Sequence, residues 1–95
     1  MLLCQEGHVR RHYLLSGRVQ EVGLRYTAFY LAEELGLSGW VSNLEDGRVE
    51  MELQGKPETI DLLLCRLDGK GRISITSMEE EEVTLKRESG FCVRG

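Results

Sequence analysis

Residues 12–36 read HYLLSGRVQEVGLRYTAFYLAEELG, and they contain a strand, a loop and a helix in direct succession. Residues 12–15 are strand-like, and the loop after them is bounded by Gly17 and Gly23. Apolar residues then recur at i, i+4, i+7, i+8 and i+11, which is one face of a helix: Leu24, Ala28, Leu31, Ala32 and Leu35. Gly36 is typical of the position just after a helix C-terminus. The stretch therefore predicts a strand, a glycine-bounded loop and a helix that ends at Gly36.

Two strands and a hairpin are predicted next. Residues 37–43 include Trp40 and Val41 and favour a strand. In residues 48–54 apolar and polar side chains alternate, which indicates a half-buried strand. The two are joined through Asp46-Gly47, a strong signal for a short hairpin turn.

A second helix and a further strand complete the pattern. Pro57 suits the first position of a helix, and the apolar face of that helix is formed by Ile60, Leu63, Leu64 and Leu67. Asp68-Gly69 ends the helix, and a strand opens at Ile73 and runs into Glu82. Residues 91–93 are a candidate fifth strand at the sheet edge.

The order strand, helix, strand, strand, helix, strand predicts an α+β fold, because two amphipathic helices are most simply buried on one face of a small sheet. We expect a ferredoxin-like βαββαβ sandwich with an antiparallel sheet and two helices on one face. The chain of 95 residues has the size of a single domain, residues 1–95, of which residues 1–10 are a candidate flexible N-terminal extension.

Composition narrows the classes of function. The net charge of -4 lacks the basic footprint of a nucleic-acid-binding protein, and no apolar run approaches the ~20 residues of a membrane span. Cys4, Cys65 and Cys92 have no spacing typical of disulfides or zinc, which indicates buried or incidental thiols. We expect a cytoplasmic protein without metal, nucleic-acid or membrane partners.

The loop before the first helix has the features of an anion site. Its backbone N–H groups and the positive end of the helix dipole would form a cradle, and Arg25 would lie at its mouth. A guanidinium matches a phosphate bidentately. Asn43 ends the neighbouring strand, so an arginine that holds a phosphoryl group and an amide that holds a water would come together. By themselves, Arg25 is also consistent with a surface arginine and Asn43 with a turn former.

At these residues the sequence resembles the acylphosphatase family, whose motifs are G-x-V-Q-G-V-x-F-R and a later G-W-V-x-N. Here the first motif corresponds to Gly17–Arg25, with the sequence GRVQEVGLR, and the second to Gly39–Asn43, with the sequence GWVSN. Gly47, Val49 and Gly55 follow at the spacing of the second family signature.

The resemblance implies a ferredoxin-like fold and a hydrolase acting on acid anhydrides, which cleaves the carboxyl-phosphate bond of small acyl phosphates and releases inorganic phosphate without a cofactor. It implies that Arg25 binds the phosphate and that Asn43 orients the attacking water. The phosphate-binding loop would comprise Val19, Gln20, Glu21, Val22, Gly23 and Leu24 together with Arg25. We expect a monomer.

Two residues depart from the family motif. Leu24 replaces phenylalanine, which is a change between apolar residues, and Glu21 replaces a loop glycine. A carboxylate at position 21 opposes a bound phosphate, so we expect reduced activity. The alternative hypothesis is a non-catalytic acylphosphatase-like binding module in which Glu21 impairs the anion loop.

Other functional interpretations are weaker. RNA binding on the sheet is disfavoured because Glu50 and Glu52 occupy outward positions and no aromatic run is present. His8 and His12 lack the partners of a metal site and are expected to be incidental or solvent-exposed. Residues 79–82, four successive glutamates, predict a solvated strand end or loop, and Trp40 predicts a core or rim aromatic.

Overall fold

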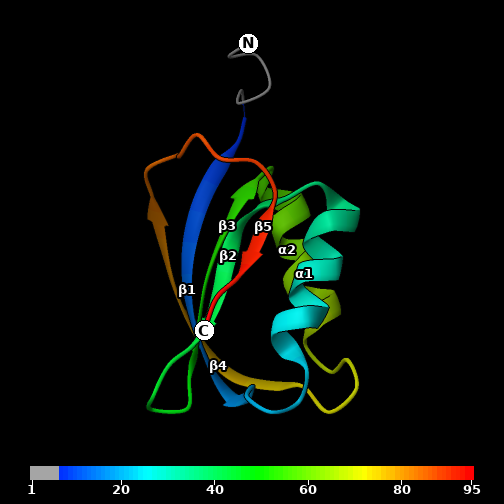
Figure 1. The fold of residues 1–95 in the computed structure, drawn as a ribbon. Helices are drawn as coiled ribbons and strands as arrows, with labels where there is room; N and C mark the ends of the chain where they lie inside the picture. The colour runs from blue at the N-terminus through cyan, green and yellow to red at the C-terminus, as the bar shows by residue number, and fades with distance from the viewer. Residues whose placement is uncertain (1–6) are drawn as a thin grey trace.

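The computed structural model describes residues 7–95, which form one five-stranded sheet with two helices on one face (Figure 1). The elements in chain order are β1 (Val9–Arg18), α1 (Leu24–Leu35), β2 (Ser38–Asn43), β3 (Val49–Gly55), α2 (Pro57–Leu67), β4 (Ser74–Val83) and β5 (Phe91–Val93). The predicted ferredoxin-like order is confirmed. The candidate N-terminal extension overlaps β1, which begins at Val9, while residues 1–6 and with them Cys4 lie outside the described residues.

The strand order is β4-β1-β3-β2-β5. The first four strands in this order pair antiparallel, but β5 pairs parallel to β2, with Gly39 opposite Phe91 and Val41 opposite Val93. The predicted antiparallel sheet is confirmed for these four strands, and the candidate fifth strand adds a parallel pair at the edge. The reason is visible in Figure 1: the chain crosses one end of the sheet from β4 to the opposite edge, so β5 runs in the same direction as β2.

The core lies between the sheet and the helices. Sheet residues that point to the helices are fully buried, and the helices meet them with apolar faces close to those predicted. Fully buried members are Tyr13, Leu15, Val41, Val49, Met51, Leu53, Ala28, Ile60 and Leu63. Among residues 7–95 no helix is both long and apolar enough to cross a membrane.

β3 is buried on both faces, so the expectation of a half-buried strand is wrong. Glu52 and Gln54 are only 8% and 3% exposed. The fully buried Arg10 of β1 donates to Glu52 Oε1 at 2.6 Å and to Gln54 Oε1 at 3.0 Å. The connection between β4 and β5 then covers these groups, because Lys86 exchanges backbone hydrogen bonds of 2.9 Å with the Gln54 amide and Glu88 lies 2.8 Å from Arg10.

The predictions for the other polar residues and the cysteines agree with the structure only in part. Residues 79–82 are exposed on the edge strand β4, as predicted for a solvated run. His12 is half-buried rather than solvent-exposed, because its Nε2 lies 2.7 Å from Glu50 Oε2 across β1 and β3. Cys65 and Cys92 are free and exposed, so neither is a buried thiol.

Candidate active site

The loop between β1 and α1 meets the end of β2 at one end of the molecule (Figure 1), and a cavity of about 140 Å³ lies there. The cavity contains both predicted catalytic residues together with part of the predicted loop and one residue that the sequence did not indicate. Its lining residues are Val19, Glu21, Gly23, Leu24, Arg25, Tyr26 and Asn43. Gln20 and Val22 belong to the same loop but do not line the cavity.

The loop begins at an irregularity in β1. The pairing of β1 with β4 shifts register between Ser16 and Gly17. A Cβ atom at Gly17 would lie 2.3 Å from the Ser74 carbonyl oxygen, so only glycine fits where the two strands approach. This β-bulge bends the end of β1 and directs the chain into the loop.

The loop backbone contains left-handed residues. Gly23, the N-cap of α1, has a φ of 79°, and Glu21 has a φ of 62°. Glu21 is the sole residue other than glycine with positive φ within residues 7–95. Turns of this kind direct successive backbone N–H groups to one side and favour anions, and the N-terminus of α1 adds unpaired N–H groups at the same place.

The Gln20 side chain fixes the loop to the neighbouring hairpin. Its Nε2 donates to the Leu44 carbonyl oxygen at 2.7 Å and to the Arg48 carbonyl oxygen at 3.0 Å. Leu44 follows Asn43 directly. The Gln20 amide therefore positions the loop relative to the end of β2, and any contact from Gln20 to a phosphate must come from its backbone N–H.

Arg25 lies in the first turn of α1 and is held by the C-terminal segment. Its Nη1 donates to the Arg94 carbonyl oxygen at 3.2 Å. The Arg94 backbone N–H donates to the Val41 carbonyl oxygen at 2.7 Å, and its guanidinium lies 4.4 Å from the centroid of the Trp40 ring. Trp40 is therefore a rim aromatic, 8% exposed, that supports the segment contacting Arg25.

Asn43 brings an available hydrogen-bond acceptor to the cavity. It is the last residue of β2, where it pairs with Val49 of β3. Its Oδ1 is buried and accepts no hydrogen bond from any residue between 7 and 95. A buried acceptor atom is normally paired with a hydrogen-bond donor. A water molecule in the cavity, which Arg25 also lines, would satisfy it.

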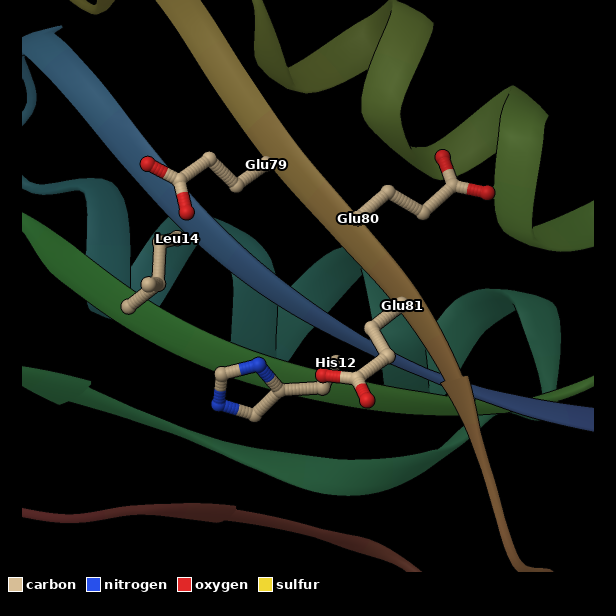
Figure 2. Close-up of a pocket in the computed structure, with 5 residues that line it drawn as sticks. All are labelled: His12, Leu14, Glu79, Glu80 and Glu81. Atoms are coloured by element: carbon tan, nitrogen blue, oxygen red, sulfur yellow. The ribbon is translucent and has the colours of Figure 1, made fainter.

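The cavity at the N-terminus of α1 differs in charge from another hollow on the sheet. Figure 2 shows that second hollow over β1 and β4, lined by His12, Leu14 and the glutamates 79–81. Glu79 and Glu81 point to the same side as His12, whereas Glu80 points toward a helix (Figure 2). These carboxylates repel anions. In the cavity at the helix N-terminus, by contrast, the guanidinium of Arg25 accompanies a single carboxylate, that of Glu21.

Sequence reasoning did not indicate Tyr26 or Arg94 at this site, and it included Gln20 in the phosphate-binding loop without predicting the hydrogen bonds of its side chain to the hairpin. Tyr26 was detectable, since it directly follows Arg25 at the helix start. Arg94 lies 69 residues from Arg25 in the chain, and no periodicity or motif connects the two.

Comparison with known proteins gives a consistent result. The model of the acylphosphatase family matches residues 11–93. The chain is 44% identical over 84 residues to an acylphosphatase of Pseudomonas paraeruginosa, an alignment that covers 87% of this chain and 92% of the relative. It is 39% identical over 85 residues to one from Clostridium perfringens, covering 87% and 96%.

Solved structures agree. An acylphosphatase from Coxiella burnetii superposes with a TM-score of 0.85 at 32% identity, covering 99% of this chain and all of the other. One from Bacillus subtilis has a TM-score of 0.84 at 27% identity, covering 92% of this chain and 99% of the other. With a family model that matches most of the chain, and with relatives that match along most of their own length, this protein belongs to the acylphosphatase family.

Proposed function

We propose that this protein is an acylphosphatase, which hydrolyses the carboxyl-phosphate bond of small acyl phosphates to a carboxylate and inorganic phosphate. The observation that carries the proposal is the position of Arg25 and the unsatisfied Asn43 Oδ1 in one cavity at the N-terminus of α1. The acylphosphatase names of its relatives support the same reaction.

Phosphate binding is assigned to the loop and to Arg25. The backbone N–H groups of the loop residues that line the cavity and of the start of α1 hold the phosphoryl oxygens, as helix N-termini commonly do. The Arg25 guanidinium neutralises the charge that grows on these oxygens during transfer. Its hydrogen bond to the Arg94 carbonyl oxygen keeps the guanidinium in place before the substrate arrives.

Water attack is assigned to Asn43. Its Oδ1 accepts a hydrogen bond from the water, which directs a lone pair of the water oxygen toward phosphorus. A bond forms between the water oxygen and phosphorus while the bond from phosphorus to the acyl oxygen breaks, and the electron pair leaves with the carboxylate. The water proton passes to the product phosphate or to solvent. A carboxylate is a good leaving group, so the step needs no general acid, and we propose that it needs no cofactor.

Arg25→Ala tests the binding assignment. We expect kcat/KM for a small acyl phosphate to fall about 10³- to 10⁵-fold, the range known for arginines that stabilise phosphoryl transfer. The matched control is Arg72→Ala, which removes an exposed arginine in the turn after α2. Hydrolysis by Arg25→Ala at the rate of the parent would contradict the site assignment.

Asn43→Ala tests the water-orienting role. We expect kcat to fall roughly 10²-fold or more while KM changes little, because a group that acts on the attacking water contributes mainly in the transition state. Steady-state kinetics separates the two constants. An equal loss through KM alone would instead make Asn43 a substrate-binding residue.

The non-catalytic binding module is not favoured, since the cavity retains both residues that the reaction requires. We further propose that the protein acts as a monomer in the cytoplasm, independently of nucleic acid and membranes. The free, exposed thiols of Cys65 and Cys92 support a reducing compartment. The net charge of -4 is unfavourable for a nucleic-acid partner.

A further inference from the structure

The cavity is too small to enclose a whole acyl phosphate. Its volume is about 140 Å³, whereas pockets that bury an organic ligand usually have roughly 300 to 1,000 Å³. The phosphoryl group has to lie near Arg25 and the loop N–H groups. The acyl group must therefore extend out of the cavity and across its rim.

The two most exposed large apolar side chains of the described residues lie on α1, the helix that begins at the cavity. Tyr26 lines the cavity and is 59% exposed, and Tyr30, one helical turn further along α1, is 66% exposed. Side chains at i and i+4 lie on the same face of a helix, about 6 Å apart along its axis. We refer to Tyr26 and Tyr30 together as the aromatic rim.

The ring of Tyr30 is held in place. The Phe29 ring, half-buried against the core, contacts it edge to face, with centroids 5.2 Å apart and an angle of 75° between the planes. Exposed tyrosines normally gain little from an outward position on a helix, since their rings stay in water. An exposed ring that packs on a neighbouring ring has less freedom to lose when it contacts a ligand, so it offers contact area at little entropic cost.

We propose that the aromatic rim binds the acyl group and makes the enzyme selective for acyl phosphates with an aromatic or bulky apolar acyl group. This inference rests on the proposed function. The Tyr26 ring contacts an acyl substituent directly attached to the carboxyl carbon. Tyr30 contacts the distal end of longer substituents, because it lies a full turn farther from Arg25.

The contact is expected to act on binding more than on turnover. The acyl substituent does not change its bonds during phosphoryl transfer, so the rim contacts it equally in the ground state and in the transition state. Uniform binding of this kind lowers KM and leaves kcat unchanged. Stacking of one aromatic pair corresponds to roughly threefold to tenfold in affinity.

The test measures kcat and KM for benzoyl phosphate and acetyl phosphate in the parent, Tyr26→Ala, Tyr26→Phe and Tyr30→Ala. We expect the ratio of kcat/KM for benzoyl over acetyl phosphate to fall roughly threefold to tenfold in Tyr26→Ala, through KM for benzoyl phosphate. Tyr26→Phe should keep the parent ratio, since the ring and not the hydroxyl makes the contact. Tyr30→Ala should affect 3-phenylpropanoyl phosphate more than benzoyl phosphate.

Two controls separate this role from damage to the site. Leu62→Ala removes an exposed apolar side chain on α2, which is 39% exposed, and should leave the ratio unchanged. Competitive inhibition by inorganic phosphate reports the cradle alone, so its inhibition constant should be the same in Tyr26→Ala and the parent.

The outcomes are distinguishable. If Tyr26→Ala slows both substrates equally, or weakens inhibition by phosphate as much as it raises KM, the tyrosine is structural and the selectivity inference is overturned, although the proposed function stands. If the parent hydrolyses neither substrate, the proposed function fails and the inference fails with it.

Discussion

Glu21 combines two unfavourable features in a single residue. It adopts a φ of 62°, a left-handed conformation that glycine tolerates and other residues adopt at a cost of roughly 1–2 kcal/mol. Glu21 also lines the cavity to which we assign phosphate binding. The family motif has glycine at this position, and Glu21 adopts a left-handed conformation that favours glycine. Relative to the motif, the glutamate therefore changes the energy and the charge of the loop.

Replacing Glu21 should separate these two features. Glu21→Gly is expected to raise the free energy of unfolding by about 0.5–1 kcal/mol, because relief of backbone strain exceeds the greater entropy of glycine in the unfolded chain. Urea denaturation measures the change. Glu45→Gly, at an exposed turn residue without positive φ, is the matched control and should be destabilising. A loss of stability in Glu21→Gly would show that the left-handed residue is not strained.

The charge is tested by Glu21→Gln, which keeps the side-chain shape. In solvent, a carboxylate roughly 8 Å from a phosphate dianion opposes binding by about 1 kcal/mol, so KM for acetyl phosphate should fall about fivefold. The difference should shrink at high salt, because exposed charges are screened. An unchanged KM at low salt would mean that the Glu21 carboxylate does not reach the bound phosphate.

The helices and the loop illustrate what local sequence determines. The apolar spacing in residues 24–35 and the proline at 57 each define an element through residues that are neighbours in the chain, and α1 and α2 have the predicted bounds at Leu24, Leu35, Pro57 and Leu67. The pairing of Arg25 with Asn43 was also predictable, because a strand-helix-strand unit returns the chain to the same end of the sheet.

The burial of β3 on both faces and the direction of β5 were not predicted, because both depend on distant partners. The alternation in β3 suggested one solvated face, but Arg10 and the connection between β4 and β5 cover Glu52 and Gln54. The direction of β5 is set by the same connection. No spacing within β3 or β5 encodes these contacts. They arise from hydrogen bonds and ion pairs between segments that are more than 30 residues apart.

Arg10 should be essential for holding that connection against the sheet. Arg10→Ala leaves the buried carboxylate of Glu52 without its closest cation, and we expect the free energy of unfolding to fall by about 3–5 kcal/mol. Arg11→Ala, at the next position of β1, removes contacts with the exposed carboxylates of Asp61 and Glu80 and should cost only about 0–1 kcal/mol. Denaturant unfolding of both variants measures the contrast, and equal losses would contradict the buried-pair explanation.

For the molecule as a whole, the buried Tyr13 of the core makes the free energy of unfolding depend on pH in the alkaline range. Burial raises the pKa of Tyr13 above its usual value near 10, although the adjacent Arg11 guanidinium acts in the opposite direction. The Tyr13 hydroxyl forms no hydrogen bond of good geometry within the described part of the chain. Because the pKa of Tyr13 is higher in the folded state, the contribution of this protonated hydroxyl to the free energy of unfolding is fully present below pH 10. It is lost as the pH rises from there toward the folded pKa.

Tyr13→Phe should remove this alkaline loss. We expect its free energy of unfolding to equal or exceed that of the parent at pH 7, since deletion of a poorly bonded buried hydroxyl is nearly neutral. Above pH 10 the variant should become clearly the more stable of the two. Urea titrations at pH 7, 9 and 10.5 test both statements, and parallel pH profiles for the two proteins would exclude Tyr13 as the responsible group.

The position of β1 between β4 and β3 has a consequence for how the chain reaches its native state. Val9 pairs with Gly55 and Arg10 with Val83, so the first strand of the described chain is flanked by segments that follow it at long distance. Loop-closure entropy opposes both pairings until the intervening chain is ordered. Proteins dominated by such non-local pairings fold in milliseconds to seconds rather than microseconds. The site at one end of the sheet likewise needs contacts between distant segments, since Arg25 and Arg94 are 69 residues apart in the chain.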